Sequence, residues 1–367
     1  MKIAILTQPL RANYGGVLQN YALQQVLIKL GHTPITLEKD INQYISTTNL
    51  IIDLPKRIIS KYILRRRQNI FSEQKHNQYY LNLRKYTKPF VDKYVNLNYI
   101  HEFTTSSIMQ YDAVIVGSDQ VWRPLYNTVS LDYMFLSFIP ADHKINRIAY
   151  AASFGVSEWE YSDIQSSKYS KLIQQFDAVS TREIEGIDFC KNFLKRHDVV
   201  SVLDPTLLIE KDYYLSICKY IPKSSKKILV AYILDVTDEI RNHLEQIAYK
   251  KSLELNIISA HKNCSLYVEE WLSMFRDAEL IITDSFHGTV FSIIFNKDFY
   301  SICNNLRGNS RFTSLLSQFN LQDRLFYDVK CINLNSNQID WRIIEDIKLT
   351  LKDKSVKFLT DNLNSNA

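Results

Sequence analysis

The chain has 367 residues, of which 46% are hydrophobic and 12% are aromatic. A chain of this length is too long for one ordinary core and predicts two domains of similar size, and its aromatic content argues against long disordered segments. The formal net charge of +5 suits a protein that handles anionic small molecules, but it is too weak to indicate a nucleic-acid partner.

The cysteines and the first residues indicate a cytoplasmic protein. The five cysteines are scattered and include no Cys-x-x-Cys pair, so they predict neither a zinc site nor a disulfide framework. Residues Met1–Thr7 lead directly into a strand-like run without the apolar core of a signal peptide. No run of about 18 apolar residues predicts a membrane span. We therefore expect reduced thiols and a cytoplasmic location.

Short, continuous apolar runs recur along the chain, and most are followed by a loop and a helical pattern. Runs without polar alternation are typical of strands buried on both faces, and their alternation with helices predicts parallel sheets. Such runs in both halves of the chain predict two Rossmann-like domains rather than one sheet. The predicted strands are Ile3–Leu6, Ala113–Val116, Ile148–Ala152, Ala178–Ser180, Val199–Leu203, Ile228–Leu234, Asn256–Ser259, Leu280–Thr283 and Phe299–Ile302.

The boundary between the domains is predicted near Asp204-Pro205 or in the polar, turn-prone stretch Pro222–Lys227. We take residues 1–205 as the N-terminal domain and residues 206–367 as the C-terminal domain.

Two segments depart from the alternation of strands and helices. Residues 41–100 are rich in Lys, Arg, Tyr and Asn and are interpreted as helices inserted after the second strand of the N-terminal domain. Within them, Lys56–Arg67 places apolar and basic side chains on different helical faces. This stretch is either an ordinary helix covering the domain or a peripheral contact with the inner face of the membrane. The final segment, Trp341–Leu359, is predicted to be a helix that packs back across the N-terminal half.

A glycine-containing turn follows the first predicted strand. The segment Asn13–Asn20 has paired glycines and opens a helix. Paired glycines let a ligand approach the backbone, and the unpaired amides of a new helix suit an anion. A plain strand–helix turn explains the glycines nearly as well, and the lack of a G-x-G-x-x-G pattern does not support a dinucleotide site. The candidate ligand-binding residues of this turn are Asn13, Gly15, Gly16 and Gln19.

Polar side chains also follow the predicted strand Ala113–Val116. Ser118, Asp119 and Gln120 come next in the chain and would lie at the carboxyl edge of the sheet, where ligands of open α/β sheets bind. An Asp-Gln pair beside the indole of Trp122 suits a sugar, because it offers hydrogen bonds to hydroxyls and a flat apolar face. The alternative is a strand-exit turn with a packed tryptophan.

Two further strand exits carry candidate anion ligands. Arg182 follows the strand Ala178–Ser180 and begins a helix, so that its guanidinium and the helix dipole favour the same phosphate. An ion pair along that helix is the alternative. Arg307 and Arg311 follow the strand Phe299–Ile302 and form a second candidate clamp, although either could be a solvated surface group.

The segment Leu280–Thr289 carries a candidate proton-transfer residue. A buried strand ends at Thr283, and Asp284 or Ser285 caps the helix that follows. His287 falls in the first turn of this helix, next to Gly288, which leaves room for a close approach. A histidine beside helix amides at the edge of a sheet is well placed for proton transfer next to a phosphate or carboxylate.

Taken in order, these motifs resemble the polysaccharide pyruvyltransferase family. The resemblance covers about residues 1–310. It implies two Rossmann-like domains in a GT-B-like arrangement, and transfer of pyruvate from phosphoenolpyruvate onto a sugar of a bacterial surface polysaccharide, without a nucleotide sugar, a metal or a further cofactor. The matching motifs are Asn13–Gln19, Gly117–Trp122, Tyr150–Gly155, Thr181–Glu183, Leu203–Thr206 and Asp284–Gly288.

The resemblance carries an essential histidine onto His287 and a donor-binding arginine onto Arg182. Formation of a pyruvate ketal needs a proton donor and cations that hold phosphate and carboxylate, which these residues would supply. Asp119 or Asp284 would orient or deprotonate an acceptor hydroxyl, although capping explains Asp284 equally well. We expect donor binding by Arg182, Ser285, Gly288, Arg307 and Arg311, and acceptor binding by Asn13, Gly15, Gly16, Gln19, Ser118, Gln120 and Trp122.

Two other functions stay open at this point. One is a GT-B glycosyltransferase that uses a nucleotide sugar, and the other is a non-catalytic glycan-binding protein. The expected partners are phosphoenolpyruvate and a sugar or lipid-linked oligosaccharide, with no nucleic acid.

Overall fold

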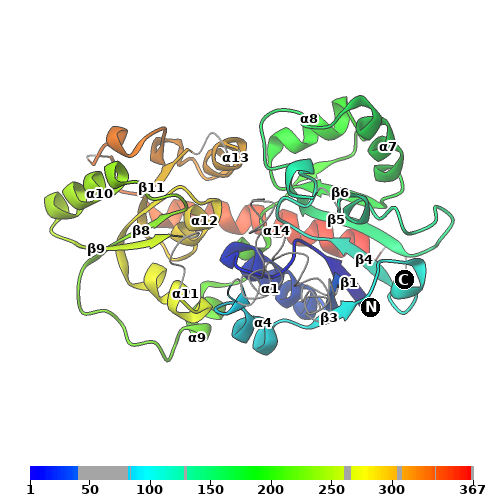
Figure 1. The fold of residues 1–367 in the computed structure, drawn as a ribbon, viewed down its shortest axis with the longest axis horizontal. Coiled ribbons are helices and arrows are strands. Elements are labelled where there is room, and N and C mark those ends of the chain that lie inside the picture. Colours follow the sequence, from blue (N-terminus) through cyan, green and yellow to red (C-terminus); the bar gives the residue numbers. More distant parts are fainter. Residues whose placement is uncertain are drawn as a thin grey trace, which may run out of the picture.

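The computed structural model describes residues 1–39, 82, 84–127, 130–259, 266–303, 308–334 and 336–364. In these ranges the chain forms two parallel β-sheets with helices around them, which lie side by side in Figure 1.

The N-terminal sheet has the strand order β3-β2-β1-β4-β5-β6-β7, and all of its pairs are parallel. Its inner strands are buried almost throughout, which is why they appear in the sequence as continuous apolar runs. The strands are β1 (Lys2–Leu6), β2 (Thr33–Lys39), β3 (Leu97–Ile100), β4 (Ala113–Val116), β5 (Asn146–Ala152), β6 (Ala178–Thr181) and β7 (Val200–Ser201).

The edge formed by β2 and β3 differs from the sequence prediction. The strand β3 falls inside residues 41–100, so the interpretation of that whole segment as helical is wrong for Leu97–Ile100. The two central residues of β3 are exposed because an edge strand needs no continuous apolar run. Helix α4 (Lys88–Tyr94) does fall in this segment. Residues 41–81, including Lys56–Arg67, lie outside the described residues.

The C-terminal sheet is also parallel, with the order β12-β11-β10-β8-β9. Four of its strands match predicted runs, whereas β12 has only two residues and was not predicted. The strands are β8 (Ile228–Ile233), β9 (Glu254–Ser259), β10 (Ala278–Thr283), β11 (Asp298–Ile302) and β12 (Leu325–Phe326).

Helices connect the strands and cover the sheets. Several begin where the sequence places a capping residue: the Ser162 side chain accepts from the amide of Gln165, and the Thr237 side chain accepts from that of Ile240. The helices not yet named are α1 (Tyr14–Lys29), α5 (Thr105–Ile108), α6 (Leu131–Met134), α7 (Asp163–Ile173), α8 (Ile184–Asn192), α9 (Lys211–Ile217), α10 (Asp238–Lys251), α11 (Val268–Asp277), α12 (Phe286–Ile294), α13 (Ser310–Gln318) and α14 (Trp341–Asn364). Short 3-10 turns include η2 (Pro124–Tyr126) and η3 (Pro205–Leu207).

The last helix, α14, crosses from one domain to the other (Figure 1). Near its start, Ile343 and Ile344 lie beside Phe319 and Leu321 of the C-terminal domain. Towards its end, Ser355 Oγ accepts a hydrogen bond from the amide of Leu203 at 3.0 Å. The backbone carbonyl of Asn362 accepts one from Asn146 Nδ2 at 2.7 Å. The helix therefore contacts both domains. The domain boundary at residue 205 remains a prediction.

The two parallel sheets confirm the predicted α/β fold class with two Rossmann-like domains. One continuous core cluster includes residues of both domains, from Ile3 and Val17 to Ile281, Phe312 and Leu359. The domains are thus packed together rather than joined by a linker alone. Within the described ranges, no helix is both long enough and apolar enough to cross a bilayer.

Candidate active site

A buried polar cluster lies where the two domains meet. The N-terminal domain contributes Asp119, Arg182 and Asp204, which follow β4, β6 and β7. The C-terminal domain contributes His287, in the first turn of α12 after β10. All four residues follow the carboxyl ends of parallel strands. The structure places them together at this edge, where the sequence predicted that strand-exit side chains would meet.

Asp204 is at the centre of this cluster. Its Oδ1 accepts hydrogen bonds from the amide and hydroxyl of Thr206, at 3.0 and 2.7 Å. Its Oδ2 accepts from Ser118 Oγ at 3.1 Å and from Arg182 Nη1 at 3.0 Å, and lies 3.6 Å from His287 Nε2. Burial favours the neutral acid, but contact with His287 and the charge of Arg182 outweigh it and lower the pKa of Asp204 far below its usual value. Asp204 is therefore a carboxylate that holds groups of both domains.

Arg182 is the main cation beside this carboxylate and is only 5% exposed. Its Nε donates to Glu183 Oε1 at 3.2 Å, and its Nη2 lies 4.0 Å from Asp119 Oδ1. Burial opposes the charge, but the three surrounding carboxylates prevail and raise the pKa of Arg182. Although it is buried, Arg182 Nη2 makes no hydrogen bond within the described residues. One donor of this guanidinium thus has no acceptor.

His287 is enclosed by the N-terminal domain. The residue is 7% exposed, with Nε2 directed at Asp204 and the ring lying against Gly15 at the start of α1. A Cβ added to Gly15 would lie 2.0 Å from His287 Nδ1, so the close approach needs glycine at this position. The helix carrying His287 is capped by Ser285, whose Oγ accepts from the Gly288 amide at 3.4 Å. Both ring nitrogens therefore face protein groups in this arrangement.

Asp119 adopts an uncommon backbone conformation at the exit of β4. Its φ of 82° lies in the left-handed region, which costs a residue other than glycine about 1–3 kcal/mol. The side chain accepts hydrogen bonds from Asn13 Nδ2 at 3.2 Å and from the Gln120 amide at 2.9 Å. This conformation directs the carboxylate toward Arg182 and the Asn13–Gly16 turn.

A second arginine approaches from the C-terminal domain at the start of α13. The guanidinium carbons of Arg182 and Arg311 lie 4.3 and 5.8 Å from the centre of the Phe286 ring. Burial, followed by the charge of Arg182, lowers the pKa of Arg311 to about 10. The neighbouring Ser310 Oγ is buried and makes no hydrogen bond within the described residues. Two cations therefore share one region, and the residue next to the second one has a hydroxyl without a partner in the described ranges.

Several predicted ligand-binding residues support the site without facing an open space. Ser118 and Gln19 are fully buried, and Gln19 Nε2 donates to Thr7 Oγ1 and to the carbonyl of Gly16. Gly288 allows close packing on β10, because a Cβ there would lie 2.1 Å from Thr283 Oγ1. The other potential cap, Asp284, accepts from the amide of Leu234 at 2.7 Å. Arg307 lies outside the described residues.

Trp122 does not offer its ring to a ligand. The residue is 0% exposed, its ring is stacked on Phe135 at 5.0 Å, and its Nε1 donates to the carbonyl of Met134 at 3.0 Å. This burial contradicts the predicted role in acceptor binding and supports the alternative, a packed tryptophan at a strand exit. The sequence prediction failed here because a Trp beside polar residues gives the same pattern in both cases.

The sequence alone does not predict the role of Asp204. The motif Leu203–Thr206 indicates a family resemblance and a domain boundary, but no function for its aspartate. An aspartate before proline at the end of a short strand is one signal that could have identified it, because the same geometry that caps the η3 turn directs the second oxygen into the sheet edge. Its partners come from positions 118, 182 and 287, which no local pattern connects.

These features define a two-domain α/β protein with a charged site buried between its domains. A family model described as polysaccharide pyruvyl transferase matches residues 13–305, so the chain belongs to this family. No curated protein sequence matches the chain.

The solved structures that resemble this chain have low sequence identity to it. A UDP-GlcNAc 2-epimerase from Neisseria meningitidis bound to UDP-GlcNAc is 10% identical, with 99% of each chain covered and a TM-score of 0.47. A glycosyltransferase from Rickettsia africae is 11% identical, with 98% of this chain and 93% of that chain covered and a TM-score of 0.47. A UDP-GlcNAc 2-epimerase from Methanocaldococcus jannaschii is 12% identical, with 98% and 99% covered and a TM-score of 0.48. Likenesses this weak carry no argument about the reaction.

Proposed function

We propose that this member of the family transfers pyruvate from phosphoenolpyruvate onto two hydroxyls of one sugar in a bacterial polysaccharide precursor, forming a cyclic ketal. Both hydroxyl oxygens bond to C2, and the C2–O bond to phosphate breaks. One of the two hydroxyl protons returns to the enzyme group that protonates C3, and the other leaves with phosphate. The reaction needs no further cofactor, because the donor itself carries the leaving group.

The observation that carries the proposal is a pair of buried hydrogen-bond donors without partners in the described part of the chain, beside two arginines. Arg182 Nη2 and Ser310 Oγ have no hydrogen-bond partner within the described residues. Both are next to Arg311, whose charge is disfavoured by burial and by Arg182. A phosphate or carboxylate would accept from both groups and would offset the repulsion between the two arginines. Phosphoenolpyruvate carries both kinds of anion.

The roles of the remaining groups follow from their positions. His287 would give the proton to C3 or to the leaving phosphate, and Asp204 would keep the ring oriented. Because both ring nitrogens face protein groups, the ring must turn or the domains must part before His287 meets a donor. Asp119, whose Oδ1 lies 4.0 Å from Arg182 Nη2, would orient an acceptor hydroxyl beside the donor.

Thermal unfolding of the purified chain tests the donor. A ligand at a hundredfold excess over its dissociation constant stabilises the folded state by about 2.7 kcal/mol, so phosphoenolpyruvate should raise the unfolding midpoint measurably. The rise should disappear in Arg182→Ala and persist in Arg342→Ala, since Arg342 is on the exposed surface of α14. A rise with UDP-, GDP- or CMP-sugars instead would favour a glycosyltransferase. No rise with any of these ligands, but binding of a glycan, would favour a non-catalytic protein.

A further inference from the structure

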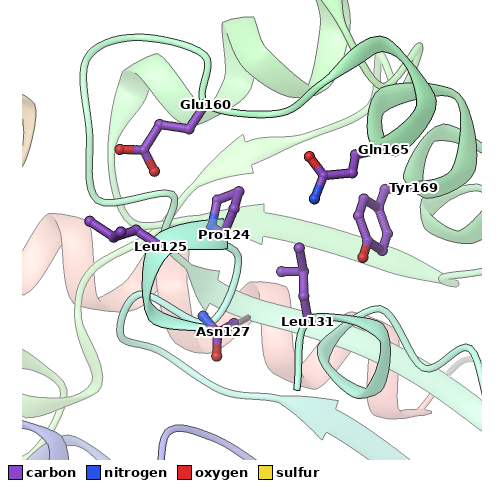
Figure 2. Close-up of a pocket in the computed structure, with 7 residues that line it drawn as sticks. All are labelled: Pro124, Leu125, Asn127, Leu131, Glu160, Gln165 and Tyr169. Atoms are coloured by element: carbon purple, nitrogen blue, oxygen red, sulfur yellow. The ribbon is translucent and has the colours of Figure 1, made fainter. Parts of the chain in front are cut away.

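A cavity of about 480 Å³ lies in the N-terminal domain beside the candidate active site (Figure 2). Its volume is within the range of about 300–1,000 Å³ that small-molecule sites occupy. Figure 2 shows Glu160 and Gln165 on one side, Asn127 and Leu131 on the other, and Pro124 between them. Leu125 and Tyr169 complete the lining.

Polar groups in the cavity are fixed in place. The Glu160 carboxylate accepts two hydrogen bonds from the buried Arg123, from Nε at 3.3 Å and from Nη2 at 3.1 Å. The Gln165 Oε1 accepts from the amide of Ser162, which orients the side chain. No hydrogen bond of Gln165 Nε2 is formed within the described part of the chain, so this donor is available in the cavity. Fixed carboxylate and amide groups are suited to sugar hydroxyls, since little side-chain entropy is lost on binding.

Apolar surface accompanies these polar groups. Pro124 and Leu131 line the cavity, and its Tyr169 wall is stacked on Phe135 at 4.4 Å. Two apolar residues of the η2 turn are exposed, Leu125 at 62% and Tyr126 at 46%. A mixture of apolar faces and fixed hydrogen-bonding groups suits a sugar ring, whose C–H face and hydroxyls need both. The negative Glu160 is balanced by Arg123, so the site favours an uncharged ligand.

The cavity is connected to the candidate active site through the segment 119–127. Arg123 Nη1 donates to Gln120 Oε1 at 3.2 Å, and Gln120 directly follows Asp119. On the other side, Tyr126 covers the Arg123 guanidinium at 4.6 Å and is close enough to Arg311 to act on its charge. The turn that lines the cavity is therefore also beside the proposed donor site.

We propose that this cavity is a second acceptor subsite, which binds a neutral sugar residue adjoining the one that receives pyruvate. The inference rests on the proposed function and extends it: the preferred acceptor contains at least two sugar residues. The contacts that select it would come from Glu160, Gln165 and the η2 turn.

Binding to an array of neutral mono-, di- and trisaccharides tests the subsite. Wild-type protein should bind at least one oligosaccharide about tenfold more tightly than any of its component monosaccharides. Gln165→Ala and Glu160→Gln should each remove most of that preference. The controls Ile164→Ala and Glu158→Gln should retain it, because both side chains are exposed next to the cavity without lining it. An array without any bound neutral oligosaccharide, or equal binding by the cavity variants and the wild type, would overturn the proposal.

The donor experiment separates this inference from the proposed function. Stabilisation by phosphoenolpyruvate should be the same in Gln165→Ala as in the wild type, because Gln165 is in the cavity rather than among the anion-binding groups. If phosphoenolpyruvate fails to stabilise the wild type while the array result holds, the proposed donor is wrong and the sugar subsite stands. If the donor stabilises both proteins and the array result fails, only the subsite is wrong.

Discussion

Gly15→Ala should separate folding from turnover. The added Cβ would lie 2.0, 2.2 and 2.7 Å from Nδ1, Cγ and Cε1 of His287. Ordinary contact begins near 3.4 Å, so the imidazole must retreat by about 1.4 Å. A misplacement of about 1 Å in a reacting group can reduce turnover about 100-fold. Alanine is also the better helix former, by roughly 0.5–1 kcal/mol, which offsets part of the about 1–3 kcal/mol that overpacking costs.

The assay is phosphate release from phosphoenolpyruvate with a glycan extract from a strain that lacks this chain, since such an extract contains the unmodified acceptor. We expect Gly15→Ala to reduce the rate about 100-fold while the protein stays folded, with an unfolding midpoint only a few degrees below that of the wild type. Gly117→Ala is the matched control: its Cβ would make only ordinary contacts, at 3.4 Å from Leu23 Cδ2 and 3.5 Å from Ile5 Cγ2. A Gly15→Ala protein with turnover within threefold of wild type, or an equal loss in Gly117→Ala, would refute the reasoning.

His287→Ala should fold normally and lose about 10²–10⁴-fold in the same assay, the usual contribution of a general acid, and near-normal turnover would remove His287 from the mechanism. Asp204→Asn should lower the free energy of unfolding by about 3 kcal/mol, because it removes one of the three carboxylates that balance the buried charge of Arg182. The pKa of Asp204 is depressed in the folded state, so the stabilisation is complete above the unfolded value of about 3.9 and is lost as the pH falls towards the folded value. Urea unfolding should therefore show a constant difference from wild type between pH 8 and pH 5 that narrows below about pH 4, and a difference that narrows near neutrality would contradict this account. Trp122→Phe should cost about 1–3 kcal/mol by leaving the carbonyl of Met134 without its donor, yet leave acceptor affinity unchanged; a selective loss of acceptor binding would restore the sugar-binding role.

The sequence predicted the elements whose side chains are buried on both faces. Strands β1, β4 and β8 have almost no exposed residue, so burial alone determines their composition. The edge strands β3 and β12 carry no such constraint. They exist because a neighbouring strand offers unpaired backbone groups, which the composition of the edge strand does not reveal.

The sequence predicts the residues of the candidate site one by one, each from the strand that it follows, but not their contacts with one another. Arg182 and His287 could be selected because each follows a buried strand and precedes a helix. The contact between His287 and Asp204 depends on how the two domains are packed, and nothing local in either segment encodes it. The same limit explains Gly288, whose missing side chain makes room for Thr283 rather than for a ligand.

The contacts of helix α14 with both domains have a consequence for any movement of one domain relative to the other. With 24 residues it is about 36 Å long, and it contacts both domains, so a relative rotation of the domains about its axis would preserve these contacts. Ser355 on this helix accepts a hydrogen bond from the amide of Leu203, the residue next to Asp204. A rotation of the domains about the axis of α14 would therefore move Asp204 only a short distance. Asp204 would then keep its place relative to the helix while groups farther from the axis move apart.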